Sequence, residues 1–185
     1  MESYSYVLTE HQTIQTERLI LRPITLADAR DIFEYASDED NTKFVFDTHP
    51  DIDHTRKQIA EYFVATPLGK YGITLAETGK LIGTIDLRID TTAKSGCLGY
   101  ALNKAFWGNG YMTEAGFALL DLSFNKLELE RVFSVHDVCN PASGKVMQRL
   151  GMTYEGTLRK SRLAKKVLVD DVYYSILKEE YINEK

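Results

Sequence analysis

Two glycines separated by one residue stand where a strand-like segment gives way to a helix-like one. Gly108 and Gly110 belong to Phe-Trp-Gly-Asn-Gly-Tyr-Met-Thr-Glu-Ala, residues 106–115, which follows a short apolar run at residues 97–102. The apolar positions after it recur at helical spacing, at Met112, Ala115, Leu119 and Leu122. Glycines let the backbone approach a ligand closely, and the unpaired N–H groups of a helix start attract phosphate oxygens. The stretch therefore predicts a preorganised anion site.

Three other interpretations compete for this loop. The ATP-binding P-loop requires Lys-Ser or Lys-Thr after its last glycine, and Tyr111-Met112 stands there instead, which excludes it. The dinucleotide fingerprint Gly-x-Gly-x-x-Gly requires a third glycine where Thr113 stands, although Asp137 could act as its ribose-binding acid. Nicotinamide binding therefore remains an alternative, and so does a turn that binds no ligand.

A second motif lies downstream. Asn-x-x-Ser occupies residues 140–143, and Leu-Gly-Met follows at residues 150–152. In this order the two motifs resemble the GNAT superfamily of acetyl-CoA-dependent N-acetyltransferases. Within it, the chain resembles the Rim-type branch, which acetylates protein N-termini, those of ribosomal proteins among them. The likeness spans residues 15–181, nearly the whole chain.

The resemblance implies an α/β (α+β) GNAT fold. In that fold a mixed, mostly antiparallel central sheet of six to seven strands has helices on both faces, and a splayed parallel strand pair receives the pantetheine arm of acetyl-CoA. Hydrophobic patterning and turn signals agree with it. Strands are predicted at residues 19–24, 71–76, 81–89, 96–102, 131–138, 153–158 and 167–177, and helices at residues 25–36, 52–65, from about 111, and at 141–150.

Length and composition predict one globular domain. The 185 residues are 44% hydrophobic and 26% charged, so we expect a single domain over residues 1–185, with a polar leader at 1–15 and a short tail at 183–185. The net charge of −5 argues against nucleic acid or an anionic membrane as a partner and is compatible with a cationic amine.

The cysteines and histidines bear on compartment and metals. Cys97 and Cys139 form no Cys-x-x-Cys motif, and neither a signal peptide nor a membrane-length apolar run is visible, so we expect a cytoplasmic protein. The four histidines lack metal-ligand spacing, and we expect no metal.

The resemblance also implies which residues bind acetyl-CoA. Main-chain amides of the glycine loop would grip the pyrophosphate, although Trp107 and Met112 depart from the superfamily's usual Gln/Arg-x-x-Gly-x-Gly/Ala. A backbone N–H at the end of the central strand would polarise the thioester carbonyl, and Asn140, otherwise a turn residue, would bond the pantetheine amide. The expected cofactor-binding residues are Tyr100, Ala101, Leu102, Trp107, Gly108, Asn109, Gly110, Tyr111, Met112, Thr113, Asn140 and Ser143.

Acetyl transfer also needs an acid for the thiolate and a base for the amine. Many superfamily members use a tyrosine as the acid where this chain has Met147, so Ser143 becomes the candidate, unless it merely caps its helix. The candidate bases are Asp86, mid-strand, and His136, near a strand end. Either could instead be a structural polar group.

These inferences define a functional hypothesis. We expect an N-acetyltransferase that moves acetyl from acetyl-CoA to a primary amine by direct attack in a ternary complex. A protein N-terminal amine is the first candidate, and small amines such as amino sugars or polyamines remain open. The alternative is a non-catalytic acyl-CoA-binding sensor. Exposed strands near the C-terminus make a homodimer an expected partner arrangement.

Overall fold

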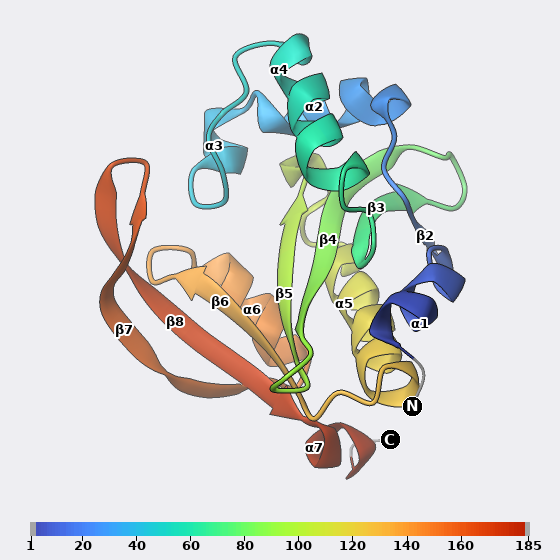
Figure 1. Cartoon of the computed structure of the whole chain (residues 1–185). Coiled ribbons are helices and arrows are strands. Elements are labelled where there is room, and N and C mark those ends of the chain that lie inside the picture. Colours follow the sequence, from blue (N-terminus) through green and yellow to red (C-terminus); the bar gives the residue numbers. More distant parts are fainter. Residues whose placement is uncertain (1–2, 184–185) are drawn as a thin grey trace. The chain divides into compact units, whose positions relative to one another are not determined.

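A computed structural model describes residues 3–183 (Figure 1). Positions 1–2 of the expected leader and 184–185 of the expected tail lie outside this range. The strands are β1 (Ile14–Gln15), β2 (Leu19–Arg22), β3 (Lys70–Leu75), β4 (Leu81–Asp90), β5 (Ser95–Leu102), β6 (Arg131–Asp137), β7 (Thr153–Ala164) and β8 (Val167–Leu177). The α-helices are α1 (Tyr4–Glu10), α2 (Ala29–Ala36), α3 (Glu39–Thr42), α4 (Ile52–Gln58), α5 (Tyr111–Asp121), α6 (Pro141–Arg149) and α7 (Lys178–Asn183).

The strands form one mixed sheet in the order β1-β2-β3-β4-β5-β6-β8-β7. Its pairs are antiparallel except for β5 with β6, which are parallel. The predicted α/β class and mostly antiparallel sheet are confirmed. There are eight strands rather than six or seven because β1, only two residues long, adds one edge by pairing with Leu21 and Ile20 of β2.

Two compact units divide the chain. The first comprises Met1–Asp86 and Tyr100–Ala118, and the second comprises Leu87–Gly99 and Leu119–Lys185. Strands β4 and β5 and helix α5 each contribute residues to both units. The predicted apolar stripe is buried, at Met112, Ala115 and Leu119 of α5 and at Leu122, the residue that follows this helix. Among the residues described, no helix is both long enough and apolar enough to cross a membrane.

In the first unit, local signals determine how the elements begin. The helix predicted from residue 25 starts with a capping box of Thr25 and Asp28, in which each side chain accepts from the backbone N–H of the other residue ahead of α2. The β3–β4 hairpin turns through Gly79 at φ +72°. Gly83 of β4 lies so close to β5 that a Cβ there would be 2.5 Å from the carbonyl oxygen of Ala101. Glycine at this position lets the end of β5 approach β4.

Two expectations for the first unit are wrong. The polar leader contains α1, which Ser3 caps and which buries Val7 and Leu8. These two apolar residues are too few to give a helical periodicity in the sequence. Burial of their side chains stabilises the helix instead. Residues 37–51, for which no helix was predicted, contain α3, which begins here because the Asp38 carboxylate accepts from the N–H groups of Asp40 and Asn41.

In the second unit, β5 pairs with β6 from Ser95↔Arg131 to Leu98↔Ser134, and β6 continues against β8 as far as Asp137. Helix α6 starts with Pro141 and is followed by Gly151 at φ +78°, as predicted. Strand β7 is longer than the predicted 153–158. Register shifts after Tyr154 and Leu158 absorb its irregular stretch, so it continues as a long twisted arm with β8 (Figure 1).

Candidate active site

The glycine loop has the backbone that an anion site requires. Gly108 and Gly110 both adopt φ +78°, a left-handed conformation that favours glycine. A Cβ added at Gly108 would meet nothing within 4 Å, so the space beside it is open. The Asn109 side chain donates from Nδ2 to the carbonyls of Phe106 and Trp107, each at 3.1 Å. Two carbonyl groups of the loop are therefore hydrogen-bonded by a side chain of the loop itself.

The backbone N–H groups of the loop, unlike these carbonyls, are available to a ligand. Within the described chain, the backbone N–H groups of residues 108–113 have no hydrogen-bond acceptor, and the first such bond of α5 runs from Glu114 N–H to the Gly110 carbonyl. Successive donors without acceptors at a helix start form a site that favours phosphate oxygens. This geometry agrees with the anion site predicted from the two glycines.

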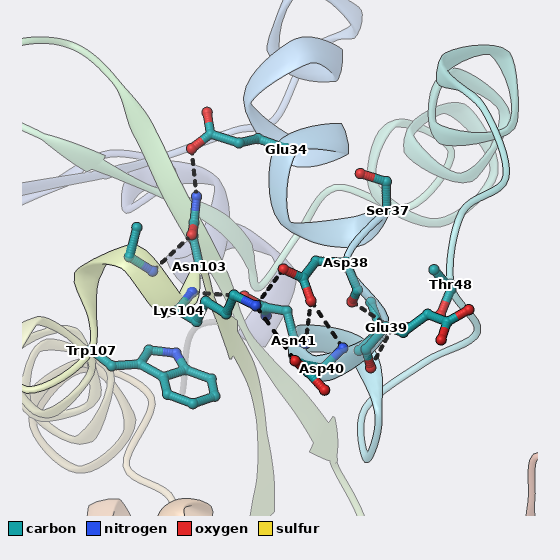
Figure 2. A network of polar contacts seen from close by, with 12 residues as sticks. Glu34, Ser37, Asp38, Glu39, Asp40, Asn41, Thr48, Asn103, Lys104 and Trp107 are labelled. Atoms are coloured by element: carbon teal, nitrogen blue, oxygen red, sulfur yellow. Dashed lines mark hydrogen bonds and ion pairs between the residues drawn. The ribbon is translucent and has the colours of Figure 1, made fainter.

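The end of β5 is fixed from two sides in the first unit. The Leu102 carbonyl accepts from Asn41 Nδ2 at 3.1 Å and from the Trp107 indole Nε1 at 2.8 Å. Asn41 also accepts from the N–H of Lys104 at 2.6 Å through Oδ1. Figure 2 shows Asn41 and Trp107 on either side of this strand end. The segment Tyr100, Ala101 and Leu102, expected to polarise the thioester, is thus held firmly at its end.

Charged side chains join α2 and α3 to the residues after β5 (Figure 2). Lys104 Nζ lies 2.5 Å from Asp38 Oδ2, and this hydrogen bond, with those from backbone N–H groups, lowers the pKa of Asp38. Asn103 donates to Glu34 at 3.0 Å. The hydrogen bond from Lys80 and then that from Asn103 lower the pKa of Glu34. The acidic residues here are therefore engaged in holding the segment after β5.

The N-terminal segment supplies contacts that sequence reasoning missed. Thr16 Oγ1 and the backbone N–H of Arg18 donate to Glu114 Oε1 at 2.6 and 2.9 Å, and Arg18 Nε donates to Oε2 at 2.7 Å. Glu114 was not among the predicted site residues. The sequence signal for these contacts was Glu114 itself, because an acid at a helix start that binds an anion needs a nearby cation.

The candidate base Asp86 lies in the first unit. Its Oδ2 accepts from the Tyr62 hydroxyl at 3.1 Å, and Lys70 is its cross-strand neighbour. The Lys70 ammonium lies 3.8 Å from the centre of the Tyr62 ring. These contacts fit the structural role that was kept as the alternative for Asp86, and a role as base stays a prediction.

The candidate base His136 lies in the second unit beneath α6. Its Nδ1 is 2.7 Å from the Asp137 carbonyl, which can only accept, so Nδ1 carries the proton. The ring stacks on Tyr174 at 5.9 Å between centroids. Its Nε2 faces Gly144, where a Cβ would be only 2.7 Å away. This tautomer leaves Nε2 as the nitrogen that can accept a proton. It lies against Gly144, the residue that follows Ser143.

The second unit also holds the Asn-x-x-Ser motif at the start of α6. Asn140 is the N-cap residue, but its side chain makes no capping bond. Ser143 is the third residue of the helix, and its N–H donates to the Asn140 carbonyl at 3.2 Å. Met147, at the position where the resemblance implies a tyrosine in many superfamily members, is fully buried. The Asn140 side chain is therefore not used to cap α6.

The predicted residues fall into two groups. The first unit contains the strand end and the glycine loop: Tyr100, Ala101, Leu102, Trp107, Gly108, Asn109, Gly110, Tyr111, Met112 and Thr113. It also contains Asp86. The second unit contains Asn140, Ser143 and His136. Among the described residues, no cluster of three or more His, Cys, Asp or Glu side chains is placed to hold a metal.

Comparison with known proteins agrees with this fold. Residues 18–153 match the acetyltransferase (GNAT) domain family, which covers more than half of the chain. The chain therefore belongs to the GNAT acetyltransferase family, and it is an acyltransferase.

Individual relatives agree as well. N-acetyltransferase p20 of Bacillus licheniformis is 33% identical over 92% of this chain and 98% of its own. YdaF of Bacillus subtilis, provisionally named a ribosomal N-acetyltransferase, is 37% identical over 58% of this chain and 59% of its own. The crystal structure of a GNAT-family acetyltransferase from Bacillus anthracis has a TM-score of 0.82 at 26% identity, over 90% of this chain and 99% of that one. The resemblance to the GNAT superfamily is confirmed, and the match to YdaF supports the Rim-type branch.

Proposed function

We propose that this acyltransferase moves the acetyl group of acetyl-CoA to a primary amine by direct attack in a ternary complex. The observation that carries the proposal is the glycine loop, where the backbone N–H groups of residues 108–113 have no acceptor within the described chain. Two left-handed glycines and a helix start present these donors together. A diphosphate is the ligand that such an array of donors recognises.

The residues present fit that ligand. Because a Cβ at Gly108 would meet nothing within 4 Å, the loop leaves room for phosphate oxygens beside its backbone. Acetyl-CoA would supply the acetyl group already activated as a thioester. A backbone N–H within the segment Tyr100 to Leu102 would polarise the thioester carbonyl, and the bonds to the Leu102 carbonyl support this role because they fix the strand end.

Ser143 and Asn140 are proposed to act on the thioester and pantetheine part of acetyl-CoA. Ser143 would donate a hydrogen bond or proton to the sulfur, and Asn140 would bond the pantetheine amide. The Asn140 side chain makes no capping bond, which supports a role in ligand binding. For the base, the bond from Nδ1–H to the Asp137 carbonyl leaves Nε2 of His136 as the nitrogen that can accept a proton, which supports that residue, whereas Asp86 is bonded to Tyr62.

The acceptor is proposed to be a protein N-terminal amine. The provisional name of YdaF, a relative 37% identical over 108 residues, supports this choice. Small amines such as amino sugars or polyamines are the alternative. Acetylation of N-terminal peptides, compared with a panel of small amines under the same conditions, separates the two classes. Preference for the small amines would contradict the proposal.

Ser143→Ala tests the catalytic proposal against the acyl-CoA sensor. Titration calorimetry should show that the parent protein binds acetyl-CoA and not NAD. With an accepted amine, the parent should release free thiol, and Ser143→Ala should lower turnover at least tenfold with unchanged CoA affinity. Ser5→Ala, on the exposed side of α1, is the matched control. Binding without thiol release from the parent would instead support the sensor.

We also propose a homodimer formed through the β7–β8 arm. Residues 159–166 contain five Lys or Arg and no acid, whereas the whole chain carries −5, so the remaining chain carries −10. The arm also has apolar side chains that are more than half exposed, at Leu158, Leu163, Val167 and Leu168. A second copy offers the acidic surface that complements this arm. The cytoplasm stays the expected compartment, on the sequence argument alone.

A further inference from the structure

Arg18 lies against the glycine loop although 91 residues separate it from Asn109. Its Nη1 donates to the Asn109 carbonyl at 3.0 Å, and its Nε donates to Glu114 at 2.7 Å. Its guanidinium carbon lies 4.6 Å from the centre of the Tyr111 ring. One side chain from the N-terminal segment therefore contacts the loop, the first residue of α5 and the first turn of that helix.

Glu114 raises an electrostatic problem that Arg18 resolves. A carboxylate in the first turn of α5 would repel a diphosphate bound at the same helix start. Burial raises the pKa of Glu114, but hydrogen bonds from Thr16 and Arg18 outweigh that effect and lower the pKa, so the carboxylate stays charged. Because the guanidinium is hydrogen-bonded to this carboxylate, it compensates the negative charge next to the loop.

Arg18 also determines the direction of a loop carbonyl. An anion site requires N–H groups to face the ligand and carbonyl oxygens to face away from it. Asn109 Nδ2 engages two loop carbonyls, those of Phe106 and Trp107, and Arg18 engages a third, that of Asn109 itself. With these three carbonyls occupied, the donors of residues 108–113 are left for a ligand.

We propose that Arg18 is a positioning residue of the diphosphate site. By holding the Asn109 carbonyl and compensating Glu114, it sets the loop for the diphosphate of acetyl-CoA. This inference rests on the proposed function, in which the loop binds that diphosphate. It follows that Arg18 governs binding of the acetyl donor through its nucleotide half, and leaves the acetyl-transfer step and acceptor binding unaffected.

Arg18→Met tests this role, with two donors compared. Acetyl-CoA carries the diphosphate, whereas S-acetylpantetheine has the same thioester and pantetheine arm without it. Arg18→Met should raise the KM for acetyl-CoA about tenfold and leave kcat within twofold, while kcat/KM for S-acetylpantetheine stays within twofold. Calorimetry with CoA should show the same tenfold loss. A purely structural role would instead affect both donors alike.

Two further variants sharpen the comparison. Arg18→Lys keeps the charge, but an ammonium cannot span Glu114 and the Asn109 carbonyl together, so about a threefold rise in KM is expected. It also carries the test if Arg18→Met does not fold. Arg56→Met is the matched control, since Arg56 is likewise paired with an acid, Asp53, in the same unit. It should leave CoA affinity unchanged.

The outcomes separate this inference from the proposed function. A parent protein that binds CoA, together with Arg18 variants of unchanged CoA affinity, overturns the role of Arg18 and leaves the proposed function standing. Equal losses with both donors also overturn it, since the effect would then not depend on the diphosphate. A parent protein that binds no CoA overturns the proposed function, and this inference with it.

Discussion

At the scale of single residues, Gly108 is the most direct test of the loop. Alanine at φ +78° costs about 1–2 kcal/mol of backbone strain, and its methyl group would enter the open space beside the loop. We expect Gly108→Ala to lower acetyl-CoA affinity about tenfold. The measurement is a calorimetric titration, supported by the emission of Trp107, the only tryptophan in the chain.

Gly79 provides the matched control for this substitution. It has φ +72° in the β3–β4 turn, and a Cβ there also meets nothing within 4 Å. Gly79→Ala should therefore cost similar stability and leave CoA affinity unchanged. Equal affinity losses in the two variants would mean that general strain, and not the loop, is responsible.

A second residue-scale prediction concerns Asp28, only 8% exposed and bonded by Arg22 at 2.7 and 3.0 Å. Burial raises the pKa of Asp28, but the bonds from Arg22 and Thr25 outweigh it, so the folded-state pKa is lowered. The charged carboxylate therefore stabilises the fold above its unfolded pKa of about 3.9, and this stability is lost as pH falls through the folded-state value.

Asp28→Asn should reveal this dependence. At pH 7 the substitution should cost about 2 kcal/mol, since it removes a charge-assisted bond and weakens the capping box. Urea unfolding of both proteins at pH 7 and near pH 3 provides the comparison. The difference between them should shrink at the lower pH, and a difference independent of pH would contradict the assignment.

At the scale of elements, the packing of α6 on β6 predicts an inverted glycine effect. Replacing glycine by alanine inside a helix usually stabilises it by up to about 1 kcal/mol. In α6, however, a Cβ at Gly144 would lie 2.7 Å from His136 Nε2, and stacking on Tyr174 holds that ring. Gly144→Ala should therefore destabilise the protein by about 1–3 kcal/mol in thermal or urea unfolding.

A double variant locates the cause of that loss. If the methyl group clashes with the imidazole, removing the ring with His136→Ala should relieve it. The double variant should then be more stable than the two single effects predict, by at least about 0.5 kcal/mol. Additive effects would place the cost of Gly144→Ala elsewhere in the helix.

The elements also show what sequence reasoning can reach. The helix start near Thr25, the glycine loop and helix α6 ahead of Gly151 were predicted because each depends on residues adjacent in sequence. Helix α1 was missed because burial of Val7 and Leu8 stabilises it. The contacts of Arg18 were missed for a related reason: they join segments 91 and 96 residues apart, and no local pattern records such a pairing.

At the scale of the whole molecule, the basic β7–β8 arm predicts salt-sensitive self-association. Light scattering should show a dimer at low ionic strength that weakens as salt screens the charges. Lys166→Glu, within the arm, should weaken the dimer about tenfold. The same charge change at Lys57 of α4 should have little effect. A monomeric parent protein at all concentrations would rule out this role for the arm.

The unpaired amides of the glycine loop have one more consequence. Hydrogen exchange is slow where an N–H is bonded and fast where it is not, even when the backbone itself is well held. The amides of residues 108–113 should therefore exchange rapidly with deuterated solvent in the isolated protein. An anion that binds there will slow their exchange. Reduced deuterium uptake at residues 108–113 should therefore report that the loop is occupied.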